Sequence, residues 1–142
     1  ISNLGINAKM NEFGAAMGLC MLDEMEVIKT KRKSLYDTYL GELDGIVKFQ
    51  KQNKNSSSNY SYFPVIFQNE SEMIKVQKAL NDLDIFPRRY FYPSLDTLNY
   101  IKPEQFMPNS RGVASKILCL PLYPELKEEE QRKIIKTVRE FL

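Results

Sequence analysis

The first forty residues alternate little between apolar and polar positions, and they predict a long helix. Asn11 suits an N-cap position and Glu12 suits the first helical turn, and no proline precedes Pro64. Residues 13–22 are nearly all apolar or small, so this half should be buried on most sides. We therefore predict one helix over about residues 11–40. Its apolar first half needs more packing partners than a single small domain provides. Its second half keeps a single apolar stripe, formed by Met25, Ile28, Leu35 and Tyr39.

Three later segments have the composition of strands. Residues 43–49 could form a short strand, and the polar residues 50–59 after it predict an exposed loop. Residues 60–67 are aromatic and β-branched, and Pro64 within them favours an edge strand or a bulge. Residues 115–122 indicate a buried strand that ends at a proline.

Two further helices follow from apolar residues spaced three and four apart. Ser71 should cap the first, and Pro124 should open the second, where glutamates occupy the positive first turn. The core-facing positions are Met73, Val76, Leu80 and Leu83 in the first helix, and Ile134, Ile135, Val138, Phe141 and Leu142 in the second. With an irregular segment between them, the order predicts an α+β fold with helices packed on one face of a small antiparallel sheet.

Composition narrows the function classes. The net charge of +2 is too small to predict a nucleic-acid or membrane partner. No apolar run approaches the roughly 20 residues that span a bilayer, and Ile1–Leu4 lacks the features of a signal peptide, so we expect a cytoplasmic protein. The chain has no histidine, which excludes Ser-His-Asp hydrolases and histidine-based metal sites.

Cys20 and Cys119 lie among apolar residues, where we expect reduced, buried thiols and no metal. Since the chain opens at Ile1 without a methionine, we expect a fragment or a processed product.

Four segments, in this order and spacing, resemble the DegT/StrS family of pyridoxal-phosphate (PLP) sugar aminotransferases. They are Gly5–Leu19, Asn59–Pro64, Ile85–Leu95 and Ile117–Pro124. Each is weak alone, but together they run along almost the whole chain. The aromatic third segment is similar to family members that aminate a nucleotide-linked 4-keto-6-deoxyhexose.

The resemblance implies a fold-type I aminotransferase of deoxysugar or polysaccharide biosynthesis. Such an enzyme uses PLP to take an amino group from a donor, typically glutamate, and pass it to a keto sugar. In the family, the Schiff-base lysine and the carboxylate at the pyridine nitrogen precede the first segment. Residues 1–142 would then be the small C-terminal domain, with no catalytic residue of its own. Its expected partners are the missing N-terminal large domain and, in a homodimer, a second subunit.

The same resemblance assigns the binding residues. Asn7 matches the position whose amide reaches the PLP phosphate of the neighbouring subunit, although an isolated Asn would more often be a turn residue. Lys9 stands at the family's arginine position near substrate, where it keeps the charge but loses the bidentate fork. Arg89, Tyr90 and Tyr92 are the candidate substrate-binding residues of the third segment, weighed against a strand end with aromatics in the core.

Two glycine features accompany these assignments. Gly14 and Gly18 should mark close helix packing rather than ligand contact. Asp84 replaces a glycine that the family usually has, and Asp tolerates the left-handed conformation better than most residues, so the turn should survive.

Two alternatives remain open from the sequence. The chain could be a free-standing module that binds single-stranded nucleic acid or protein, through cations and aromatics at residues 88–92 and the basic run 29–33. It could also be a dimerisation domain whose interface is the apolar helix at residues 13–22. The second alternative is compatible with the aminotransferase.

Overall fold

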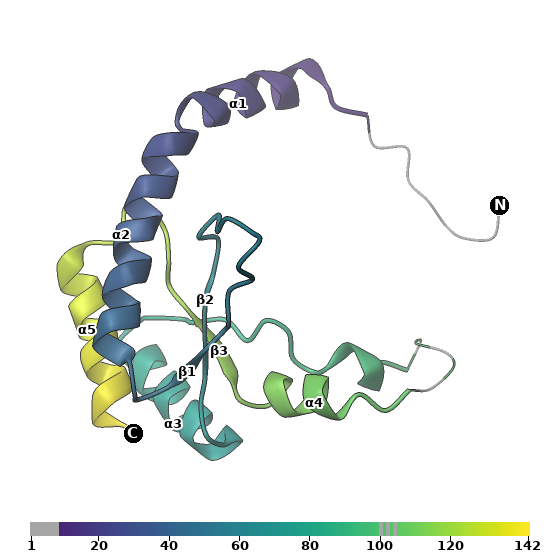
Figure 1. Cartoon of the computed structure of the whole chain (residues 1–142), viewed down its shortest axis with the longest axis vertical. Helices are drawn as coiled ribbons and strands as arrows, with labels where there is room; N and C mark the ends of the chain where they lie inside the picture. The colour runs from purple at the N-terminus through teal and green to yellow at the C-terminus, as the bar shows by residue number, and fades with distance from the viewer. Residues whose placement is uncertain (1–8, 100, 102, 104) are drawn as a thin grey trace.

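The computed structural model describes residues 9–99, 101, 103 and 105–142. Within these residues, five α-helices, a short 3-10 helix and three strands make an α+β fold, as predicted (Figure 1). In chain order they are α1 (Glu12–Asp23), α2 (Met25–Leu43), β1 (Lys48–Phe49), β2 (Phe63–Ile66), α3 (Glu70–Asn81), η1 (Leu95–Thr97), α4 (Pro108–Ala114), β3 (Ile117–Leu120) and α5 (Glu128–Glu140).

The predicted helix over residues 11–40 is two consecutive helices. Asn11 caps the first as predicted, because its side chain accepts a hydrogen bond from the Gly14 N–H at 2.7 Å. The break falls at Glu24, beyond which α2 runs down to the sheet while α1 turns away from it (Figure 1). Neither proline nor glycine occupies the break, so no local sequence signal predicts it.

The sheet is antiparallel with the order β1-β2-β3, which makes β2 its central strand. The prediction that Pro64 places its strand on an edge is therefore wrong. Pro64 is tolerated because β1 is only two residues long and pairs with Val65 and Ile66, so the ladder on that side ends before Pro64. On the other side Pro64 lies opposite Cys119 of β3.

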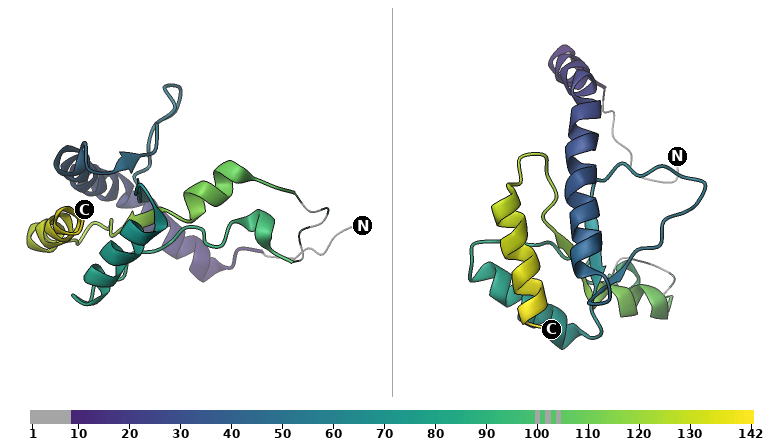
Figure 2. Two further views of the ribbon diagram at one scale, coloured as in Figure 1. Left: turned by 90° about the horizontal axis from the view of Figure 1, so that it is seen from below. Right: turned by 60° about the vertical axis from the view of Figure 1, so that its left-hand side comes forward.

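Helices α2, α3 and α5 lie together on one side of the sheet, and α4 lies on the other (Figure 2). The single apolar core forms between these three helices and the sheet. Its fully buried members include Tyr39 of α2, Phe63 of β2 and Val138 of α5. Gln131 of α5 is buried as well, and its amide donates to the Leu35 carbonyl of α2 at 2.7 Å. Apolar burial and one buried hydrogen bond thus join the first and last parts of the domain.

Several side chains differ from their predicted environment. Leu83, Phe141 and Leu142 were expected in the core but are exposed, because each follows the last turn of its helix rather than lying on the buried face. Cys20 is also exposed, whereas Cys119 is buried as expected. A Cβ on Gly18 would meet nothing within 4 Å, so within the described residues this glycine does not mark close helix packing.

Helix boundaries and one helix were also mispredicted. Asn69, not Ser71, caps α3, since its side chain accepts the Glu72 N–H at 2.9 Å. Helix α5 begins at Glu128 after a turn, not at Pro124. The segment expected to be irregular contains α4, which begins at Pro108 in the first-turn position that proline favours.

Candidate functional site

The start of the chain carries the predicted cofactor and substrate contacts. Asn7 lies outside the described residues. Lys9 is described and exposed, two residues before the Asn11 cap of α1. The first N–H groups of a helix lack intrahelical acceptors, so Lys9 lies beside a helix end suited to an anion.

The segment 88–92 begins at the sheet and then leaves it. Arg88 forms a bridge with Cys119 of β3, in which the Arg88 N–H donates to the Cys119 carbonyl at 3.2 Å and the Cys119 N–H donates back at 2.7 Å. Beyond this bridge Tyr90 is half-buried, whereas Phe91 and Tyr92 are exposed. The aromatic residues therefore project from the end of the sheet and do not fill the core.

A cavity of about 550 Å³ lies beside this segment. Its size falls within the range of small-molecule sites, which is roughly 300 to 1,000 Å³. The walls come from the turn after α3, the starts of β2 and α5, and the chain that follows β3. Aromatic and charged side chains in these walls include Tyr62, Phe86, Arg88, Tyr90, Tyr123, Glu130 and Lys133. Such a lining can receive a ring and hold polar groups at its rim.

Tyr90 and Tyr62 form the aromatic wall of this cavity. Their ring centroids are 5.2 Å apart at 75°, an edge-to-face pair. The structure thus brings Tyr90 together with Arg88 of the same segment, and with Tyr62 and Tyr123, which the sequence did not mark as site residues. Tyr62 could have been suspected, because it is a large aromatic at the start of a strand in one of the four segments.

Tyr123 contributes a protonated phenol to the cavity. Burial raises the pKa of its hydroxyl, and the nearby carboxylates of Glu130 and Glu125 raise it further. The group therefore stays neutral at physiological pH and can both donate and accept a hydrogen bond.

Arg89 points into the protein interior, away from this cavity. Its guanidinium donates to the Glu70 carboxylate of α3 at 3.0 Å and lies over the Tyr92 ring at 3.6 Å. Tyr92 in turn does not line the cavity, so the structure separates the predicted site residues into two groups. Tyr90 belongs to the cavity, whereas Arg89 and Tyr92 form a pair on the other side of the segment. Their contact with substrate stays a prediction.

The turn that leads into this segment depends on Asp84. Its φ of 59° lies in the left-handed region, where Asp is tolerated better than most residues. The prediction that Asp84 can hold a left-handed turn is confirmed.

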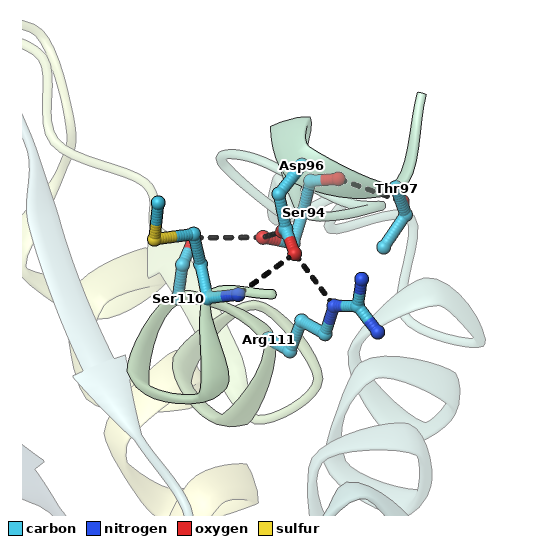
Figure 3. A network of polar contacts seen from close by, with 6 residues as sticks. Ser94, Asp96, Thr97, Ser110 and Arg111 are labelled. Atoms are coloured by element: carbon cyan, nitrogen blue, oxygen red, sulfur yellow. Dashed lines mark hydrogen bonds and ion pairs between the residues drawn. The ribbon is translucent and has the colours of Figure 1, made fainter. Parts of the chain in front are cut away.

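A polar network holds the chain after Pro93 against α4 (Figure 3). Asp96 accepts hydrogen bonds from Ser94, from the Met107 N–H at 3.1 Å and from the Arg111 Nε at 2.6 Å. Ser94 also bonds Ser110 of α4 at 2.7 Å. The Ser94 hydroxyl, with Arg111 and the Met107 N–H, lowers the pKa of Asp96 to about 2. We call these residues the Asp96 network. The sequence did not predict it, because it joins residues some fifteen apart without periodicity.

Three other features of the described residues bear on function. The basic run 29–33 is partly neutralised, since Lys29 pairs with Glu26 and Lys33 with Asp37. Within the described ranges there is no group of three His, Cys, Asp or Glu side chains that could hold a metal ion. No helix in that part of the chain is long and apolar enough to cross a membrane.

Residues 1–139 match the DegT/DnrJ/EryC1/StrS aminotransferase family. The chain is 39% identical to a dTDP-4-amino-4,6-dideoxy-D-glucose transaminase of Escherichia coli, over 93% of its own length and 38% of the relative's. It is 24% identical to a GDP-perosamine synthase of Escherichia coli O157:H7, over 97% of the chain and 38% of that protein. The chain thus spans about two fifths of the length of these relatives.

Solved structures show the same fold. The aminotransferase TlmJ from Streptoalloteichus hindustanus superimposes with a TM-score of 0.86 at 19% identity, covering 99% of this chain and 39% of that one. A DegT DnrJ EryC1 StrS aminotransferase from Brucella abortus gives a TM-score of 0.83 at 25% identity, covering 97% of this chain and 37% of that one.

Proposed function

The chain belongs to the DegT/DnrJ/EryC1/StrS aminotransferase family, and from this premise we propose that it is the C-terminal part of a PLP-dependent enzyme that aminates a nucleotide-linked keto sugar. The observation that carries the proposal is the family match over residues 1–139, which includes the segments around Asn7 and Tyr90. Two relatives named for nucleotide-linked amino sugars support this substrate class. We propose glutamate as the amino donor.

The residues present fit one part of PLP. The exposed N-terminal turn of α1 is suited to the phosphate, and Asn7 precedes it by four residues. When bound, PLP supplies the electron sink of transamination. Following the family resemblance, we assign the attachment lysine and the pyridine carboxylate to the part of the enzyme that precedes the first segment, so the chain by itself should not be catalytic.

The exposed aromatic segment supports the sugar-nucleotide assignment. Tyr90 and Tyr62 give the cavity a wall on which a ring can stack, and Arg88 adds a cation at its rim. Tyr92 and Lys9, which do not line this cavity, are proposed as further substrate contacts. Arg89 is proposed to contribute to substrate binding from the same segment, through its contact with Tyr92.

The apolar surface of α1 supports a partner outside the chain. Phe13 is 83% exposed and Met17 is 71% exposed, although both are large hydrophobic side chains. Exposed apolar surface of this extent marks an interface. We propose that the large domain and a second subunit cover it, in a homodimer in which Asn7 reaches the neighbouring cofactor. We also propose a cytoplasmic location.

The proposal can be tested by assaying the complete enzyme with PLP, glutamate and a dTDP-linked 4-keto-6-deoxyhexose. We expect an amino sugar nucleotide, detected by mass spectrometry. Failure to aminate any nucleotide-linked keto sugar would overturn the substrate class.

Replacing Asn7 tests the cofactor contact separately. In the complete enzyme, Asn7→Ala should weaken PLP retention during dialysis while the far-UV circular dichroism is unchanged. Asn3→Ala, a neighbouring Asn outside the family motif, is the matched control. Unchanged cofactor retention in Asn7→Ala would disprove the phosphate contact.

The alternative of a nucleic-acid-binding module has little support in the structure. Half of the basic run is paired with carboxylates, and Arg89 is tied to Glu70. Binding to single-stranded RNA that weakens steeply with salt would revive it.

A further inference from the structure

We propose that Arg89 is a positioning residue, which orients the Tyr92 ring toward the keto-sugar substrate without touching the substrate itself. This inference rests on the proposed function. It differs from a direct substrate contact, because Arg89 would act through Tyr92.

The guanidinium of Arg89 joins two helices that are distant in sequence. Its Nη2 donates to the Glu70 carboxylate of α3 at 3.0 Å, and to the Ala114 and Ser115 carbonyls at the end of α4 at 3.3 and 3.1 Å. The Arg89 side chain is only 17% exposed. Nη2 has two hydrogen atoms for these three acceptors, so at least one hydrogen is shared, and together the contacts tie this edge of the guanidinium to both helices.

Tyr92 lies against this guanidinium. The Arg89 Cζ is 3.6 Å from the centroid of the Tyr92 ring, which is the distance of a stacked cation–π contact. Tyr92 is 53% exposed, so burial in the core does not determine where its ring lies. Stacking on Arg89 covers part of the ring and leaves the rest open to a ligand. A large exposed aromatic held by a buried cation is typical of a recognition surface rather than of a core.

Arg89 is the first residue after the backbone leaves its hydrogen-bonded bridge with the sheet. Arg88 is still bridged to Cys119 in the sheet, and the chain leaves the sheet immediately afterwards. The side chain of Arg89 therefore supplies the next anchor, between the sheet and the exposed rings. Loss of this anchor should move Tyr92 while leaving the sheet intact.

Direct contact between Arg89 and a substrate phosphate is less well supported. Its charge is balanced by Glu70, and its Nη2 hydrogen atoms are directed at protein oxygens. A phosphate would have to share a guanidinium that Glu70 already pairs with, on a side chain that is only 17% exposed. Arg88, by contrast, is an exposed cation that lines the cavity.

The test compares Arg89→Met and Arg89→Lys in the complete enzyme, measured in each half of the reaction. For Arg89→Met we expect KM for the keto sugar to rise roughly tenfold or more, because small misplacements of binding groups have large kinetic effects. The half-reaction with glutamate should change less than about twofold. Arg89→Lys should lie in between, since lysine keeps the pair with Glu70 but not the planar stack. Arg132→Met, an exposed arginine paired with Glu128 on α5, is the matched control and should change neither half-reaction.

A double-mutant cycle distinguishes positioning from direct contact. In a Tyr92→Leu background, Arg89→Met should have little further effect on KM, because the ring through which it acts is gone. Additive losses would overturn the proposal and favour direct contact by Arg89. Equal losses in both half-reactions would overturn it in favour of a general structural role. If Arg89→Met does not fold, Arg89→Lys completes the same cycle. A wild-type enzyme that aminates no keto sugar would instead overturn the proposed function, and this inference with it.

Discussion

Helices α1 and α5 have nearly the same length, but α5 packs against the rest of the chain and α1 is exposed. Helix α1, with 12 residues, is apolar on most sides, and none of its residues is buried. Helix α5, with 13 residues, is polar over much of its surface, yet Ile134 and Val138 are almost completely buried. Hydrophobic content alone would assign α1 to the core and α5 to the surface.

The difference shows that the spacing of apolar residues, and not their number, indicates whether a helix packs against other elements of the same chain. A helix with one apolar stripe has its partner surface in the same domain, as α5 has in α2 and α3. A helix that is apolar all round needs partners on several sides, whereas α1 contacts the neighbouring α2 and has no buried residue among those that the structure describes. The stability of this domain should therefore depend on α5 and hardly on α1.

The largest effect should come from the buried face of α5. Ile134→Ala should lower the free energy of unfolding by about 2–5 kcal/mol, because it leaves a cavity at a side chain that is 1% exposed. Urea denaturation followed by circular dichroism measures the change. Ile74→Ala on the exposed side of α3 is the control and should stay within about 0.5 kcal/mol of the wild type. A small effect at Ile134 would show that α5 is not the anchor of the domain.

A smaller effect should come from the buried hydrogen bond between α5 and α2. Gln131→Leu removes the amide that donates to the Leu35 carbonyl, and should destabilise the fold by about 1–2 kcal/mol in the same experiment. Gln68→Leu, at an exposed glutamine, is the control. Stabilisation by Gln131→Leu would mean that this contact between the helices is dispensable.

The Asp96 network should show a smaller, pH-dependent effect on the opposite side of the sheet from α5. Because the folded state lowers the pKa of Asp96 to about 2, below the unfolded value of about 3.9, its contribution is fully present above about pH 4 and is lost as the pH falls toward 2. Asp96→Asn should therefore lose less stability than the wild type between pH 5 and pH 2. Thermal unfolding at several pH values measures this, and identical losses would contradict the assignment.

The features that sequence predicted are local ones. The Asn11 cap, the left-handed Asp84 and the buried stripe of α5 each depend on residues within a turn or two of one another. The central position of Pro64 was missed because it depends on the length of β1, which lies elsewhere in the chain. The Asp96 network was missed for the same reason, since it closes only when α4 packs on η1.

For the candidate site, too, the sequence predicted the segment but not the orientation of its side chains. The family resemblance identified the aromatic segment, but the sequence could not separate Tyr90, which lines the cavity, from Arg89, which faces Glu70. Neighbouring residues of an extended segment point in opposite directions, and which side holds the ligand is decided by the elements packed against each.

The smallest effect on stability, and a large one on association, should come from α1. Leu19→Ala should change the free energy of unfolding of the chain by less than about 0.5 kcal/mol, because the side chain is already 65% exposed. The apolar surface of α1 should instead drive self-association of the chain. The double substitution Met17→Glu with Leu19→Lys should reduce this association, because charges at an apolar interface are costly to desolvate. Sedimentation velocity measures the association. Ile74→Lys, which adds a charge at an exposed residue of α3, should leave it unchanged. A wild-type chain that is strictly monomeric at high concentration would show that α1 is no interface, and the contrast with α5 would then need another explanation.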